Sequence, residues 1–169
     1  MARIVRIHHA LLARFGLGAL AVAGLLALAA EGAYYSVVVD IKEAKLFQGL
    51  PESEMRSVEK QLKTVKHAAG HEIVVRGEGG VGFMVITDGT VSVKTIRGHT
   101  RKLGPGDSFG EMALLDHEGR SATITADTDV TMATIPEGNF KPFLKEHPEV
   151  AYRLLQTLSR RIRQAEADL

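Results

Sequence analysis

Short β-branched runs separated by glycine-containing turns fill residues 64–135 of this chain. Runs that recur at roughly 8 to 12 residues are typical of a β-barrel, a sandwich or a jelly-roll, whereas an α/β fold would alternate them with helical periods. Asp88 and Gly89 stand between two of the runs, and an Asp-Gly pair in that place predicts a β-hairpin. The runs read EIVVRG, GFMVITDG, TVSVKTIRG, RKLGPGDSF, SATITADTD and VTMATIPEG.

Helical periodicity flanks the β-rich part on both sides. A short amphipathic helix is predicted over 51–63, because apolar residues recur there at helical spacing and Pro51 suits a first helical turn. The period becomes helical again over 139–169, with Pro148 near the start of the last helix. We therefore predict a mainly β fold with flanking helices, a β-roll or jelly-roll. The apolar positions of the first helix are Leu50, Met55, Val58 and Leu62.

Residues 1–39 differ in character from residues 40–169, and we predict a domain boundary between the two parts. A basic stretch precedes an uncharged run from Phe15 to Ala30. This order fits a secretory signal peptide, and residues 10–35 are also long enough to anchor in a membrane. A buried N-terminal helix and translated sequence upstream of the true start are the alternatives. We expect membrane association of this segment and a folded domain that faces the cytoplasm.

Composition and charge exclude several function classes. Lys and Arg number 21 against 20 Asp and Glu, and a formal net charge of +1 gives no field that would draw nucleic acid. The chain has no cysteine, so disulfides and thiolate sites are excluded. The 7 histidines are scattered, which predicts no metal site and no cofactor. No triad order and no pair of catalytic carboxylates stands out, so we expect no enzyme.

The chemistry concentrates in the loop FGEMALLDHEGRSAT, residues 109–123. Gly110 lets the backbone approach a ligand closely, and residues 111–115 can form one helical turn whose free N–H groups face an anion. Arg120 can grip two phosphate oxygens, whereas Glu111 would repel a phosphate and suits a ribose hydroxyl. These residues fit a cyclic phosphodiester with a free 2′-hydroxyl. An internal Glu111–Arg120 ion pair that caps a surface turn accounts for the same spacing.

This loop resembles the phosphate-binding cassette of the cyclic nucleotide-binding domain family. Members of that family include the catabolite activator protein, the regulatory subunits of cyclic-AMP-dependent protein kinase and cyclic-nucleotide-gated channels. The preceding stretch 103–107, LGPGD, also matches the family pattern, and the resemblance covers residues 43–165. It implies a β-roll fold and a cyclic nucleotide ligand. The matching cassette residues are Phe109, Gly110, Glu111, Met112, Ala113, Leu114, Arg120, Ser121 and Ala122.

The resemblance implies a role for several residues. Glu111 would accept a hydrogen bond from the ribose 2′-hydroxyl, and Arg120 would pair with the cyclic phosphate. Ser121 and the backbone amides of Ala113 and Leu114 would surround that phosphate.

The base end of the pocket is less well defined by the same resemblance. Val91 and Leu103 would be walls of the base and ribose pocket, and each could equally belong to the core of the roll. The activator protein contacts the adenine amine with hydroxyl residues of its last helix, where this chain has Gln164, Ala165 and Glu166. Ser121, in place of threonine, favours cyclic AMP before cyclic GMP.

Three function classes remain. The first is a ligand sensor, a regulatory module that binds a cyclic nucleotide and passes a change to its last helix. The second is a transcription regulator of the activator-protein type, truncated or dependent on a partner, which would need a helix-turn-helix that residues 1–169 do not hold. The third is a structural β-roll without a ligand. We rank the sensor first, with no direct contact to nucleic acid.

The last helix carries two further expectations. Its alternating four-and-three apolar spacing predicts a short coiled-coil seam and a weak homodimer, while Val150 and Leu154 face the roll. The three arginines 160, 161 and 163 are interpreted as the solvated end of the helix. The positions of the seam are Ala151, Leu155, Leu158, Ile162, Ala165 and Leu169.

Overall fold

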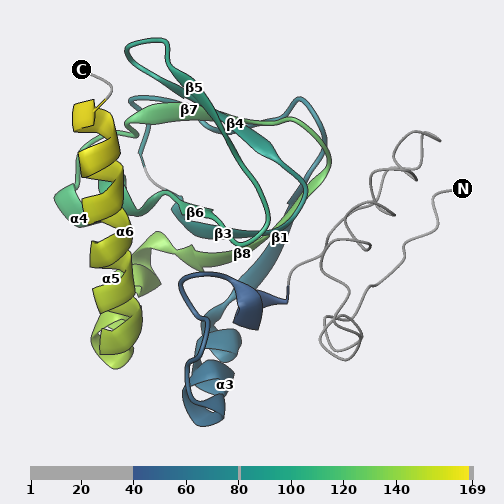
Figure 1. The fold of residues 1–169 in the computed structure, drawn as a ribbon. Coiled ribbons are helices and arrows are strands. Elements are labelled where there is room, and N and C mark those ends of the chain that lie inside the picture. Colours follow the sequence, from purple (N-terminus) through teal and green to yellow (C-terminus); the bar gives the residue numbers. More distant parts are fainter. Residues whose placement is uncertain (1–39, 80, 168–169) are drawn as a thin grey trace, which may run out of the picture. The chain divides into compact units, whose positions relative to one another are not determined.

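Two antiparallel sheets form a β-roll in the part of the chain that the structure describes. The computed structural model describes residues 40–79 and 81–167. One sheet has the strand order β1-β8-β3-β6 and the other the order β2-β7-β4-β5 (Figure 1). The predicted mainly β fold with flanking helices is confirmed. The strands are β1 (Lys63–His67), β2 (Glu72–Val74), β3 (Gly82–Asp88), β4 (Val91–Thr95), β5 (Thr100–Leu103), β6 (Ser108–Phe109), β7 (Ala122–Ala126) and β8 (Val130–Pro136).

Three of the described helices flank the roll at the beginning and the end of residues 40–167, and the fourth lies in the loop between β6 and β7. Pro51 is the N-cap of the first of them, and Leu62 leaves it with extended backbone directly before β1, so this helix is shorter than the predicted 51–63. Figure 1 shows α6 running along one side of the roll, next to α4 and after α5. The helices are α3 (Glu52–Gln61), α4 (Glu111–Asp116), α5 (Glu137–Glu146) and α6 (Pro148–Ala167), and a 3-10 turn, η1, spans Ile41–Glu43.

The turn at Asp88-Gly89 does not close a hairpin, so that prediction is wrong. β3 pairs with β8 and β6, whereas β4 pairs with β5 and β7 in the other sheet. The turn therefore carries the chain from one sheet to the other. Gly89 has a φ of 83°, and a Cβ there would lie 2.3 Å from the carbonyl oxygen of Asp129. Glycine is required because the backbone of the next loop packs against this crossing.

β3 separates two apolar clusters, which explains why its sequence is apolar without alternation. Phe83 and Val85 pack into a cluster with α3, α5 and α6, and Met84 and Ile86 pack into the interior of the roll. A strand that is buried on both faces needs apolar residues at consecutive positions. Val150 and Leu154 of α6 belong to the first cluster and are 0% and 2% exposed, as expected for the face toward the roll.

The predictions for residues 1–39, including the membrane segment 10–35, lie outside the described residues. Within residues 40–79 and 81–167, the structure contains no helix with the length and hydropathy needed to cross a bilayer.

Candidate functional site

A cavity of about 1110 Å³ lies between the β4–β5–β7 side of the roll, α4 and the C-terminal half of α6. Most of the cassette residues that the sequence singles out line this cavity, together with side chains of α6. The cassette residues in the lining are Phe109, Gly110, Glu111, Met112, Ala113, Arg120, Ser121 and Ala122.

Arg120 is a buried cation whose guanidinium is held by backbone carbonyls. The residue is 4% exposed; its Nη1 donates to the carbonyl of Gly110 at 2.8 Å and its Nη2 to the carbonyl of Gly82 at 3.0 Å. Burial lowers the pKa of Arg120 from its usual value, and the carboxylate of Glu111 offsets part of this effect. The two carbonyls fix the orientation of the guanidinium without neutralising its charge.

Glu111 is a buried carboxylate that pairs with the last helix. The residue is 2% exposed, and its Oε1 accepts a hydrogen bond from Nη1 of Arg161 at 2.5 Å. The Nη2 of Arg161 donates to the carbonyl of Ser108, also at 2.5 Å. Among the ion pairs of the described residues, none joins Glu111 to Arg120. The internal ion pair that the spacing allowed is therefore replaced by a pair between α4 and α6.

Two complementary polar atoms, on two residues that line this cavity, have no hydrogen-bond partner. They are Oε2 of Glu111, an acceptor, and Nε of Arg120, a donor, and both are buried. Leaving a buried charged group partly unsatisfied costs about 1–3 kcal/mol or more. A ligand that offers a hydroxyl to the acceptor and an anionic oxygen to the donor would satisfy both atoms.

Gly110 allows the close approach on which this geometry depends. Its φ is 95°, and it caps the N-terminus of α4. A Cβ at this position would lie 2.6 Å from the carbonyl oxygen of Gly82 and 2.8 Å from Nη1 of Arg120. Only glycine combines the left-handed backbone with this lack of space, so Gly110 determines where the guanidinium sits.

Three of the residues that the sequence singles out lie outside the lining. Val91 and Leu103 are directly paired across β4 and β5 and are buried inside the roll. Val93 and Arg101 form the pair two positions further along the same ladder, so they lie on the same face of the sheet as Val91 and Leu103. It is this second pair that lines the cavity. Leu114 points to the other apolar cluster, where it packs together with residues of α5 and α6.

Sequence reasoning missed Arg161 as a residue of the site, because it assigned this arginine to the solvated end of the helix. Its side chain is 21% exposed and lines the cavity. The signal is its position: Val150, Leu154, Leu158 and Arg161 follow at four, four and three residues and share one face of α6. An arginine in the buried stripe of a helix must find a carboxylate, and Glu111 supplies it.

Arg101 of β5 is a second cation that sequence reasoning missed. It lines the cavity. Arg101 is exposed overall, but desolvation of part of its side chain lowers its pKa. Repulsion from Arg161 lowers this pKa further, while Glu111 acts in the opposite direction. The sequence of its strand does not distinguish Arg101 from a solvated β-strand residue. Arg101 becomes part of the cavity only because the tertiary structure places α6 opposite it.

The far end of the cavity is formed by α6 and is largely apolar. Leu158 and Ile162 line it, and Ile96, which is 75% exposed, faces it from the β4–β5 turn. The stretch 164–166 of α6 lines the same cavity. A planar apolar group could be enclosed here, with the carboxamide of Gln164 as a polar contact.

Comparisons with known proteins agree with this geometry. Residues 64–147 match the family model described as "Cyclic nucleotide-binding domain". The chain is 28% identical over 134 residues to the "CRP-like cAMP-activated global transcriptional regulator" of Mycobacterium tuberculosis, covering 76% of this chain and 60% of the relative. It is 33% identical over 122 residues to "Glutaminase 2" of Bradyrhizobium diazoefficiens, covering 72% of this chain and 19% of that enzyme.

Among solved structures, the chain is similar to the catabolite activator protein of Thermus thermophilus, with a TM-score of 0.66 and 30% identity. The match covers 73% of this chain and 61% of that one. The chain thus spans about 60% of the length of the regulator from Mycobacterium tuberculosis and of this structure.

Proposed function

The chain belongs to the family of cyclic nucleotide-binding domains, and on this premise we propose that it is a non-catalytic sensor module for a 3′,5′-cyclic purine nucleotide, cyclic AMP before cyclic GMP. The observation that carries the proposal is the pair of unsatisfied buried atoms, Oε2 of Glu111 and Nε of Arg120, on two residues that line one cavity. A cyclic nucleotide presents both complements, a ribose hydroxyl and a charged phosphodiester, in one compact ring.

In this proposal Arg120 binds the phosphate. Its guanidinium is buried, is oriented by two carbonyls and keeps its charge, so the anion meets a preorganised cation. Ser121 and the backbone of α4 add neutral donors, and Gly110 leaves room for the ring. Lysine could not replace Arg120, since an ammonium lacks the planar fork.

Glu111 binds the 2′-hydroxyl and couples the ligand to α6. Its carboxylate already accepts from Arg161, so a hydroxyl that donates to Oε2 changes the electrostatic balance of the Glu111–Arg161 pair. Because Arg161 belongs to α6, the occupied and empty cavity should differ in how firmly this helix is held. That difference is the signal that a sensor passes on.

The preference for cyclic AMP rests on chemistry at both ends of the ligand. Ser121 lines the cavity near the phosphate end, and Gln164 and Glu166 of α6 offer acceptors for an exocyclic amine at the other end. The relative from Mycobacterium tuberculosis is named as cAMP-activated. Cyclic GMP has a carbonyl oxygen where adenine has its amine, and this oxygen would face the carboxylate of Glu166.

Calorimetric titration of the full chain with cyclic AMP, 2′-deoxy cyclic AMP and cyclic GMP tests the proposal. We expect binding of cyclic AMP, weaker binding of cyclic GMP, and a loss of about 1–3 kcal/mol for Glu111→Gln with cyclic AMP only. Glu118→Gln, an exposed change in the same loop, is the matched control. An equal loss for Glu111→Gln with the 2′-deoxy ligand contradicts the ribose role. No binding at millimolar concentration contradicts the sensor and favours the structural β-roll.

A second candidate function follows from the relatives. A chain that spans about 60% of a transcriptional regulator's length corresponds to the sensor part of such a protein. In that case the same cavity would regulate DNA binding by another part or partner. Affinity for duplex DNA with cyclic AMP present, measured by fluorescence anisotropy, distinguishes this candidate, because the sensor module by itself should show none.

The organisation of the whole chain is also part of the proposal. Residues 40–169 form the ligand-binding domain and face the cytoplasm, and residues 1–39 attach it to a membrane. The uncharged run from Phe15 to Ala30 supports the membrane attachment. Because the arginines at positions 3, 6 and 14 favour an N-terminus on the cytoplasmic side, a segment that crosses the bilayer would send the domain outward. A cytoplasmic domain therefore requires an interfacial or re-entrant segment, unless translation starts further along the chain. Fractionation of the full-length protein tests it, and a protein found entirely in the soluble fraction contradicts it.

A further inference from the structure

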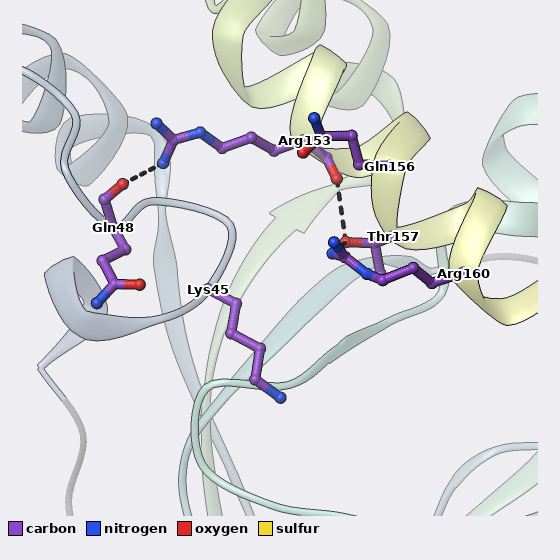
Figure 2. Close-up of a pocket in the computed structure, with 6 residues that line it drawn as sticks. All are labelled: Lys45, Gln48, Arg153, Gln156, Thr157 and Arg160. Atoms are coloured by element: carbon purple, nitrogen blue, oxygen red, sulfur yellow. Dashed lines mark hydrogen bonds between the residues drawn. The ribbon is translucent and has the colours of Figure 1, made fainter.

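A second pocket of about 540 Å³ lies between the turn after η1 and the middle of α6. Figure 2 shows Lys45 and Gln48 on one side and four residues of α6 on the other. The two pockets share no lining residue, so this one is separate from the cavity around Glu111 and Arg120. Its lining residues are Lys45, Gln48, Arg153, Gln156, Thr157 and Arg160.

Every lining residue of this pocket carries a hydrogen-bond donor, and none is a carboxylate or an apolar side chain. Lys45 and Arg153 have carboxylate neighbours just outside the pocket, Asp107 at 2.9 Å and Glu149 at 3.0 Å. Among the described residues Arg160 has no ion-pair partner. The pocket therefore keeps a surplus positive charge.

Hydrogen bonds hold the two walls of the pocket in place. Arg153 of α6 donates to the backbone carbonyl of Gln48 on the opposite wall. Thr157 donates to the carbonyl of Arg153 at 3.0 Å and accepts from Arg160 at 3.1 Å (Figure 2). Arg160 is thus positioned at the edge of the pocket, although no carboxylate among the described residues forms an ion pair with it.

We propose that this pocket binds a ligand through phosphate groups. Ammonium, guanidinium, amide and hydroxyl donors together match the many acceptor oxygens of a phosphate. Since apolar side chains are lacking in the lining, a base, an acyl chain or the side chains of a peptide would find nothing to pack against. The volume exceeds that of a single oxyanion, so a ligand with adjacent phosphates fits best.

An occupied pocket would connect the turn after η1 to α6. Lys45 and Gln48 belong to that turn, whereas Arg153, Thr157 and Arg160 belong to the helix that also carries Arg161. A ligand bound to both walls resists any movement of α6. The pocket would then be a second site that acts on α6. A small anion bound here and the ligand of the larger cavity would both affect the position of this helix.

Tripolyphosphate is the probe for the first test, in calorimetric titrations of the full chain at low salt. We expect Arg160→Ala and Lys45→Ala each to weaken binding about tenfold or more. Arg163→Ala removes the same charge from an exposed position of the same helix that lines neither pocket, and it should leave the affinity within about twofold.

Backbone amide shifts supply a readout of position. We expect tripolyphosphate to shift the amides of Gln48, Gln156 and Thr157. Equal losses for Arg160→Ala and Arg163→Ala, or shifts confined to the cavity around Glu111, would overturn the proposal. Binding of sulfate as tight as that of tripolyphosphate would also overturn it, because it would show an adventitious ion only.

Vesicles distinguish the two sources of such phosphate groups. Phosphatidylcholine vesicles with and without phosphatidic acid are sedimented with the wild type and with Arg160→Ala. If binding depends on phosphatidic acid and Arg160→Ala lowers it, the site is supported and its phosphate belongs to a lipid headgroup. If Arg160→Ala weakens tripolyphosphate but not this binding, the site is supported and its ligand is soluble.

Discussion

The Oε1 atom of Glu111 on α4 lies 2.5 Å from Nη1 of Arg161 on α6, so that a buried carboxylate joins the cassette to the last helix. The second guanidinium nitrogen of Arg161 donates to the carbonyl of Ser108. The last helix is therefore attached at the residue that is expected to receive the ribose. This relationship links ligand binding to helix position more directly than the apolar contacts of Leu114 do.

A double-mutant cycle should measure the Glu111–Arg161 pair. Glu111→Gln, Arg161→Gln and the double variant are compared by their free energies of unfolding in urea. Because Arg161 is partly exposed, we expect a coupling of about 1–3 kcal/mol, below that of a fully buried pair. Arg163→Gln should change stability by less than about 0.5 kcal/mol. Additive single changes would contradict the coupling.

Arg120 should serve both the ligand and the fold. Arg120→Ala removes the cation that faces the phosphate and should cost about 2–5 kcal/mol of cyclic AMP affinity. It also leaves the carbonyls of Gly82 and Gly110 without their donor and should cost about 1–3 kcal/mol of stability. Calorimetry and urea unfolding measure the two losses. Full affinity in Arg120→Lys would show that the fork of the guanidinium is not needed.

Gly110→Ala should destabilise the domain. Left-handed backbone costs an alanine about 1–2 kcal/mol, and the clash with the carbonyl of Gly82 adds to this. Gly138→Ala is the matched control, since it lies in α5 with open space around the added Cβ. That change should stabilise the protein by about 0.5–1 kcal/mol, as alanine suits a helix better than glycine. Thermal unfolding tests both expectations, because the melting temperature should fall for Gly110→Ala and rise for Gly138→Ala.

The stability of the domain should fall on acidification through the titration of His67. Desolvation, and then repulsion from the stacked ring of His71, lower the pKa of His67 from 6.5. The unfolded chain then takes up a proton at this residue more readily than the folded chain does. The contribution of His67 to the free energy of unfolding is therefore fully present above the pKa that this residue has in the unfolded chain, and it is lost as the pH falls below that value. His67→Gln should flatten this profile in urea unfolding.

NMR titration of the imidazole signals checks the cause. His71→Gln removes the repulsion and should raise the pKa of His67, but not to the unfolded value, because the desolvation remains. A pH profile of stability that His67→Gln leaves unchanged would contradict this assignment.

The exposed apolar face of α6 should support a weak homodimer. Leu155 and Ile162 are 62% and 59% exposed, while Leu158 packs partly against the core and leaves the predicted seam narrower. Leu169, its last position, lies outside the described residues. Leu155→Glu should abolish dimers in sedimentation velocity, and Gln156→Glu, an exposed change on another side of the same helix, should not. A wild type that stays monomeric at high micromolar concentration contradicts the seam.

The cassette and the strands could be predicted from the sequence because their signals are local. The β-branched runs and the helical period of 139–169 report which faces are buried, and the structure has strands and helices there. The residues of the loop 109–123 lie within a few positions of each other, so their meeting at one cavity follows from the chain itself. The Asp88-Gly89 turn shows the limit, since an Asp-Gly pair determines a turn and not which strands then pair.

The sequence by itself thus determined the β-roll, the helical periods and the identity of the cassette residues. Only the tertiary structure decided which of the four arginines of α6 reaches Glu111, and that Val93 and Arg101 rather than Val91 and Leu103 face the cavity. The rotation of α6 is fixed by the burial of Val150 and Leu154 against residues far away in the chain. Such a rotation depends on the summed packing of the whole core, which a local pattern does not contain.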